Sequence, residues 1–207
     1  MEVVGASRGT LGRQERGHET RRNLTRTAAR LWGERGFDDV TVEEICSEAG
    51  VGRTTFYLHF ESKERLLAGL AGATSAGVAA DLEATGGSES LDEQLDVLIR
   101  GIARRMQDVP KSLAQLVIHS QQLGLMKAGR DVIARSTRFA DLARGVLADA
   151  RRRGELARSA DPEELGEILG ALTMDAIEAW ASGRSRKSLT AVLRFRYALV
   201  VDQYRST

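Results

Sequence analysis

The chain is poor in the residues on which many enzymes and secreted proteins depend. Its 207 residues include 1 cysteine, 2 prolines and 3 histidines, and only 5% of them are aromatic. One cysteine cannot form a disulfide within the chain, so we expect a protein of the reducing cytoplasm. The sequence has no apolar run long enough to cross a membrane and no apolar segment typical of a secretion signal near residue 1. Scarce proline, together with abundant alanine, leucine, arginine and glutamate, predicts an all-α fold of about nine helices.

Residues suited to catalysis are also few. The histidines His18, His59 and His119 are far apart, and the sequence has no phosphate loop, nucleophile elbow or cluster of zinc ligands. Cys46 falls on the apolar side of a short predicted helix, which favours an inert core thiol over a nucleophile or a redox sensor. We therefore predict a protein that is not an enzyme and has no catalytic residue, no metal site and no cofactor.

Residues 41–60 carry the clearest pattern in the chain. Thr41 followed by Glu44 forms a capping box that begins a helix, and Gly50 supplies the left-handed conformation that ends it. Apolar residues recur with helical spacing on both sides of the turn, which predicts two helices packed on a common core. These apolar positions are Val42, Ile45, Cys46, Ala49, Val51, Phe56 and Phe60. The polar residues of the second helix face outward, so the segment predicts a helix-turn-helix of the kind that enters the major groove of DNA.

The stretch from Thr41 to Leu66 resembles the DNA-binding signature of the TetR family of bacterial transcriptional regulators. It contains the spaced pattern Thr-x-x-x-Ile-x-x-x-Ala-Gly-Val-x-x-x-Thr-Phe-Tyr-x-His-Phe-x-x-Lys-Glu-x-Leu, preceded by the Gly36-Phe37 pair that ends the first helix in that family. Two positions depart from the family: Gly52 stands where serine is common, and Leu58 where a polar or aromatic residue is common. The resemblance covers about the first third of the chain. It implies a DNA-binding domain followed by a helical domain for ligand binding and dimerisation.

The outward residues of this segment predict a division of labour on DNA. Arg53 is expected to reach the O6 and N7 atoms of guanine, with Thr54 reading or positioning nearby. Hydroxyl, imidazole and ammonium groups beside the second helix are expected to bind phosphates, and they belong to Thr41, Tyr57, His59 and Lys63. The full candidate DNA surface comprises Thr41, Gly52, Arg53, Thr54, Thr55, Tyr57, His59 and Lys63.

The charge distribution supports DNA binding less directly. The formal net charge is only +1, whereas DNA-binding proteins commonly present a basic surface. Residues 1–30 nevertheless hold seven arginines and three glutamates, a local net charge of +4. This segment is either a solvated extension or an arm that contacts phosphates or the minor groove. We expect residues 1–16 to be disordered and the first helix to run from about Glu19 to Arg35.

The rest of the chain predicts further helices in two domains. We expect the DNA-binding domain at residues 17–77 and the ligand-binding and dimerisation domain at residues 78–207. Ser62 should begin a fourth helix, and Gly69, Gly72 and Gly77 should each weaken it by about 1 kcal/mol relative to alanine. We expect this helix to move as a lever when an effector binds. Later helices are expected at residues 91–109, 112–125, 130–153, 161–180 and 188–204.

The last two predicted helices are apolar over more than one face. They are either core helices of a single subunit or the surface on which two copies associate, because a large exposed apolar patch usually marks a partner surface. The family resemblance favours a homodimer. The candidate interface residues are Leu169, Leu172, Ile177, Trp180, Leu193, Phe195 and Val200, and they cannot all face a partner.

Polar residues in the middle of the chain could line an effector cavity, or could simply form a solvated helix face. The candidate ligand residues are Met106, Gln115, His119, Gln122 and Met174. The sequence thus predicts a DNA-binding regulator, and we expect a repressor that a small-molecule effector releases from a palindromic operator. The alternative is a chromosome-organising DNA-binding protein on the same scaffold without an effector.

Overall fold

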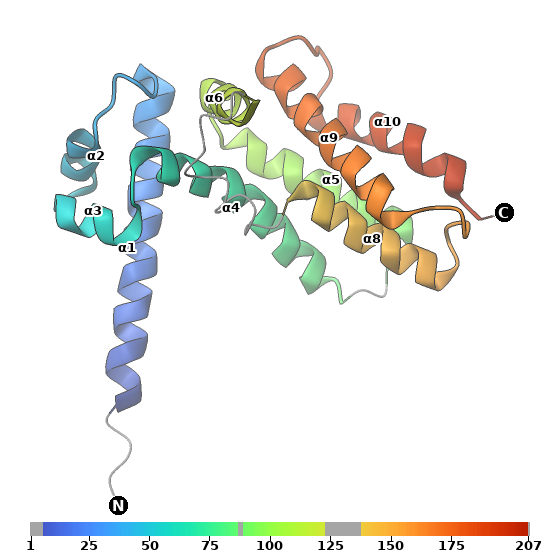
Figure 1. The fold of residues 1–207 in the computed structure, drawn as a ribbon, viewed down its shortest axis with the longest axis horizontal. Helices are drawn as coiled ribbons and strands as arrows, with labels where there is room; N and C mark the ends of the chain where they lie inside the picture. Colours follow the sequence, from blue (N-terminus) through green and yellow to red (C-terminus); the bar gives the residue numbers. More distant parts are fainter. Residues whose placement is uncertain (1–5, 87–88, 123–137, 207) are drawn as a thin grey trace, which may run out of the picture. The chain divides into compact units, whose positions relative to one another are not determined.

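The computed structural model of the protein describes residues 6–86, 89–122 and 138–206. Within these ranges the secondary structure is helical apart from one isolated bridge between Leu156 and Arg205, which confirms the predicted all-α fold (Figure 1). The chain divides into two compact units, residues 1–66 and 67–207, so the boundary falls inside the expected domain 17–77. No helix in the described ranges is long and apolar enough to span a bilayer.

The first unit begins with α1 (Ala6–Arg35), which starts well before the expected position near Glu19. Residues 1–5 lie outside the described ranges, but residues 6–16 are helical, which corrects the prediction that this segment is disordered. That prediction was based on the lack of an apolar periodicity in this segment. Such a periodicity indicates that a helix packs on a core, but a helix can also form without it. Arginine, glutamine and glutamate are good helix formers, and extending an existing helix is far easier than starting one. Gly36, with φ of 90°, ends the helix as predicted.

Two short helices complete the helix-turn-helix, α2 (Val42–Ala49) and α3 (Arg53–His59). They pack successively, α1 against α2 and α2 against α3. Burial of apolar side chains from all three helices holds them together. The fully buried core residues include Leu24, Ala28, Ile45 and Phe56, and Trp32, Cys46 and Phe60 are nearly so. Burial also raises the pKa of the Cys46 thiol, which keeps it protonated and poorly nucleophilic.

In its described residues, the second unit contains the remainder of α4 and five further α-helices. As Figure 1 shows, α8 and α9 lie side by side, and α10 packs against α9 and α5. The bounds are α4 (Lys63–Ala84), α5 (Leu91–Gln107), α6 (Lys111–Gln122), α8 (Phe139–Arg153), α9 (Pro162–Ala181) and α10 (Leu189–Val201), followed by a 3-10 turn (Asp202–Tyr204). The expected helices 112–125 and 130–153 correspond to α6 and α8, and their parts at 123–125 and 130–137 lie outside the described residues.

Close packing of α8 on α9 depends on two glycines. A Cβ atom on Gly170 would lie 2.7 Å from the Cβ of Ala140, and one on Gly166 would lie 2.9 Å from the Cβ of Arg144. Both distances are far below a normal contact, so only glycine permits this approach of the two helices. The glycines of α9 are thus packing positions.

A buried hydrogen bond joins α9 to α10. The hydroxyls of Thr173 and Tyr197 lie 2.6 Å apart, and Thr173 Oγ1 also donates to the carbonyl of Leu169 at 2.8 Å. Both side chains are almost completely buried, and burial raises the pKa of Tyr197 to about 12. The tyrosine therefore stays neutral, and its polar atom is satisfied within the core.

Gly77 of α4 proves to be a contact site as well. Arg105 of α5 donates to the Gly77 carbonyl at 2.7 Å and to both carboxylate oxygens of Asp81. A Cβ atom on Gly77 would lie only 2.2 Å from the Arg105 guanidinium. Gly77 therefore leaves the space that the Arg105 guanidinium occupies. Alanine at this position would stiffen α4 and would also displace Arg105, which connects α5 to α4.

Candidate DNA-binding surface

The helix-turn-helix is set by two local devices that the sequence predicted. Thr41 caps α2 by accepting from the Glu44 N–H at 3.2 Å, while Glu44 accepts from the Thr41 N–H at 2.8 Å. The bond from the Thr41 N–H, the Arg35 guanidinium and the Thr41 hydroxyl lower the pKa of Glu44 to about 2, because each stabilises the charged carboxylate. Gly50, with φ of 66°, then ends α2 and turns the chain toward α3. The start and end of α2 therefore follow from residues within a short stretch of chain.

The outward face of α3 presents the expected polar donors. Arg53 and Thr54 are exposed, and the Tyr57 side chain is 48% exposed. Arg53 Nη1 lies 2.8 Å from Glu43 Oε1, and both of these side chains are more than half exposed. Such a surface ion pair is weak, of the order of 0–1 kcal/mol. It orients Arg53, and Arg53 can still leave Glu43 to bind the edge of a guanine base. Leu58, at 79% exposure, gives the same face an apolar contact group.

The remaining residues that were predicted to contact DNA differ in exposure and in whether their polar groups are already bonded within the protein. Thr55 and His59 are partly buried, whereas Gly52 is exposed, and a Cβ atom added to it would have no neighbour within 4 Å. The Thr41 hydroxyl is engaged in its cap. Lys63 donates to the carbonyls of Phe37 at 2.6 Å and Val40 at 2.9 Å, so two of its three N–H groups already hold the turn before α2. Its main role inside the free protein is structural.

The contact between α1 and the reader helix α3 is also fixed by polar groups. Arg21 Nη1 donates to the His59 carbonyl at 2.9 Å, and its guanidinium lies 4.4 Å from the centre of the Phe60 ring. Asn23 Nδ2 donates to the Ala49 carbonyl at 2.9 Å, at the end of α2. These bonds place the surface of α1 in a fixed relation to α3.

Beside this contact, α1 forms a hollow of about 580 Å³ with Val51, in the turn that precedes the reader helix. Arg22 and Arg26 are exposed there, and neither forms an ion pair with any residue that the structure describes. The sequence placed both in a basic segment, but it gave no sign of the hollow, because Val51 meets α1 only in the folded unit. The lining residues are Arg16, Glu19, Thr20, Arg22, Asn23, Arg26 and Val51.

Of the five predicted ligand residues, the structure describes the side chains of three. Met106 lies in the core at 6% exposure, Gln115 is exposed and Met174 is partly buried. The side chains of His119 and Gln122 lie outside the described residues.

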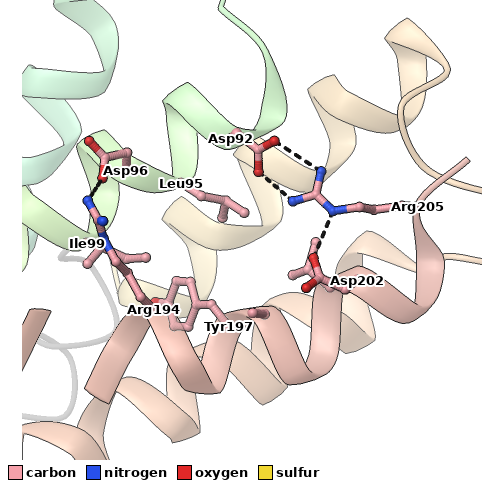
Figure 2. A pocket seen from close by; sticks show the side chains of 10 residues that line it. Asp92, Leu95, Asp96, Ile99, Arg194, Tyr197, Asp202 and Arg205 are labelled. Atoms are coloured by element: carbon pink, nitrogen blue, oxygen red, sulfur yellow. Dashed lines mark hydrogen bonds and ion pairs between the residues drawn. The ribbon is translucent and has the colours of Figure 1, made fainter. Parts of the chain in front are cut away.

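The second unit has a hollow of about 290 Å³ between α5 and α10 (Figure 2). Its floor is apolar, and Tyr197 lies along it. Arg205 binds Asp92 and Asp202 at one end, while Arg194 binds Asp96 at the other. Both arginines are thus neutralised within the chain, so these charges hold α10 to α5 and offer no free cation for a ligand.

The predicted dimer residues separate into core and surface. Leu169 and Leu193 are fully buried and Ile177 is 4% exposed, so these three belong to the core of their own subunit, which corrects their assignment to a partner surface. The reason is that α9 and α10 are apolar around more than one face, and one face packs inward. Leu172, Trp180 and Val200 are partly buried, and Phe195 is 61% exposed. Two further exposed apolar residues, Ile168 and Leu199, were not among the predicted interface residues and lie on the same two helices.

These features define a helix-turn-helix domain joined to a second helical unit. A sequence model of the family described as bacterial regulatory proteins, tetR family, matches residues 24–70. The amino-terminal part of the chain therefore matches the DNA-binding domain of the TetR family.

Individual relatives agree with this assignment. The uncharacterized HTH-type transcriptional regulator YerO of Bacillus subtilis is 44% identical over 50 residues, 24% of this chain and 17% of YerO. The HTH-type transcriptional regulator TcmR of Streptomyces glaucescens is 26% identical over 136 residues, 66% of this chain and 60% of TcmR. The chain thus spans less than two thirds of either relative.

The fold of most of the chain is similar to that of a solved repressor. The structure of Thermus thermophilus FadR, a TetR-family transcriptional repressor in complex with lauroyl-CoA, superposes with a TM-score of 0.70. Sequence identity is 24%, and the superposition covers 87% of this chain and 92% of FadR.

Proposed function

We propose that this protein is a transcriptional repressor that binds a palindromic operator as a homodimer and is released by a small-molecule effector. The observation that best supports DNA recognition is the outward face of α3. There Arg53, Thr54 and Tyr57 project from a capped and tightly packed helix-turn-helix. Arginine and threonine at the start of such a helix can reach base edges, while the phenol of Tyr57 donates to a phosphate.

A homodimer is the second part of the proposal. A reader helix of seven residues contacts few base pairs, and a two-fold axis doubles the contacts on a palindrome. The exposed apolar side chains Ile168, Phe195 and Leu199 lie on α9 and α10. Their burial against a second copy would remove apolar surface from water, and Leu172 and Val200 would extend the same contact.

Release by an effector is the third part. FadR of Thermus thermophilus was solved with lauroyl-CoA, and its fold resembles that of this chain. By analogy, the effector site belongs in the second unit, where we propose that Met106, Gln115, His119, Gln122 and Met174 contribute. An effector releases DNA only if it binds the DNA-free conformation more tightly than the DNA-bound one.

Selection of duplexes from a random DNA pool with the purified protein tests this function. We expect enrichment of one inverted repeat whose half-sites are about one helical turn apart, the spacing of two reader helices in a dimer. Enrichment of AT-rich DNA without a common motif would instead favour the chromosome-organising alternative. Release of the selected duplex by a metabolite extract, but not by buffer, would support the effector.

A further inference from the structure

We propose that the hollow on α1 is a second DNA contact, a seat for a backbone phosphate beside the base pairs that α3 reads. The inference rests on the proposed function and adds to it a set of residues outside the helix-turn-helix. The seat is formed by Arg16, Arg22 and Arg26 of α1 together with Val51.

Its charge suits a phosphate. Three arginines and one glutamate line the hollow, which leaves a local net charge of +2. Arg22 and Arg26 lie one helical turn apart, and like charges at this spacing weaken a helix. Two other arginines of α1 are held by carboxylates: Arg30 binds Glu34 and Glu48, and Arg35 binds Glu44. In the described part of the chain Arg22 and Arg26 have no such carboxylate, so both guanidinium groups remain available to an anion.

Its position suits DNA rather than a free anion. Val51 stands two residues before Arg53, the first residue of α3, so the hollow borders the start of the reader helix. Asn23, which lines the hollow, is bonded to the Ala49 carbonyl, which fixes this face of α1 against the turn. A strand whose bases meet α3 must carry its phosphates along the rim of the major groove, next to the reader. A cationic hollow at this place is positioned to receive one of them.

The length of α1 adds basic sequence beyond the hollow. The helix continues toward its amino end beyond α2 and α3 (Figure 1). Arg13 and Arg8 belong to this extension in the sequence. A basic helix that leaves the reader in this way can follow a strand into the flanking DNA, so the footprint of each subunit should extend past the base pairs that α3 contacts.

The double variant Arg22→Ala/Arg26→Ala tests the seat through the salt dependence of operator binding. Each phosphate contact contributes about 0.9 to the slope of log K against log salt concentration. We expect the slope to fall in magnitude by about 1–2 and the affinity near physiological salt to fall about tenfold, equally on operator and scrambled duplexes. Arg22→Lys/Arg26→Lys should restore most of the slope, because lysine also binds phosphate.

The matched control is Arg158→Ala/Arg186→Ala, which removes the same charge from two exposed arginines of the second unit. It should leave the slope unchanged. An unaltered slope in the α1 variant, or an equal change in the control, would overturn the phosphate seat. A wild-type protein that binds all duplexes equally would overturn the proposed operator recognition instead, whatever the slope does. The two ideas can therefore fail separately.

Discussion

The two units of this chain are held in shape by interactions of different range. Around α3, the cap and the turn join near neighbours, Thr41 with Glu44 and Gly50 with the last turn of α2, and two bonds from α1 add to them. In the second unit they join distant residues, such as the Leu91 N–H with Glu155 and the carboxylate of Asp92 with Arg205. A helix-turn-helix that is defined by caps and turns can keep its structure when the rest of the sequence differs. A unit built from long-range packing can change shape when one contact is lost, which suits a domain that responds to a ligand.

The largest expected effect separates core from surface on α10. Leu193→Glu would bury an unpaired charge at a fully buried position, and the cost of several kcal/mol should unfold the second unit. Phe195→Glu changes a residue that is 61% exposed, so the subunit should stay folded and only the association of two copies should weaken. Thermal unfolding followed by circular dichroism, together with mass by sedimentation, distinguishes the two. If Phe195→Glu stays dimeric at micromolar concentration, this face is not the dimer interface.

The next effect tests whether glycine is required where α8 meets α9. Gly170→Ala would push a methyl group against Ala140, and we expect a loss of about 1–3 kcal/mol in the free energy of unfolding. Gly145→Ala on α8 meets nothing within 4 Å and should instead stabilise the protein by about 0.5–1 kcal/mol. Urea denaturation measures both. Similar effects of the two substitutions would show that helix propensity, and not close approach, decides at Gly170.

A smaller effect concerns the local cap of the reader. The folded-state pKa of Glu44 is about 2 against an ordinary value of 4.5. A lowered pKa gives stability that is fully present above the ordinary value and is lost as the pH falls through the lowered one. We therefore expect the first unit to lose stability between about pH 4.5 and 2, and Glu44→Gln to reduce this pH dependence. Unfolding curves at several pH values measure it, and the same dependence in both proteins would show that Glu44 is not its source.

The smallest effect is expected at Gly52, the N-cap of α3. Its backbone is extended, with φ of −77°, and no side chain caps the helix. Gly52→Ser should add a capping hydroxyl and stabilise α3 by a few tenths of a kcal/mol. The same hydroxyl can donate to a phosphate, so operator affinity, measured by titration of the selected duplex, should rise slightly. Weaker binding in a variant of unchanged stability would indicate that DNA approaches Gly52 too closely for a side chain.

The range of the interactions also explains what the sequence could predict. Caps and turn glycines act within a few residues, so Thr41, Gly50, Ser62, Asp161 and Ser188 correctly located the ends of helices. The start of α1 was wrong because no local signal marks it.

Contacts between distant segments were harder to predict. Leu169 and Leu193 were assigned to a partner surface because periodicity shows that a residue is apolar without showing which neighbour covers it. The hollow beside Val51 was missed for the same reason, since α1 and the turn before α3 must meet in the folded unit before it exists.

The most direct test of DNA reading is the binding of Arg53→Ala to the selected operator and to a scrambled duplex at one salt concentration. If Arg53 reads a guanine, the variant should lose about 1–3 kcal/mol on the operator and almost nothing on the scrambled duplex beyond one lost charge, and selection with it should relax one position in each half-site. If Arg53→Ala weakens both duplexes equally and leaves the selected motif unchanged, Arg53 contacts only the backbone and the proposal that α3 reads bases through it is contradicted.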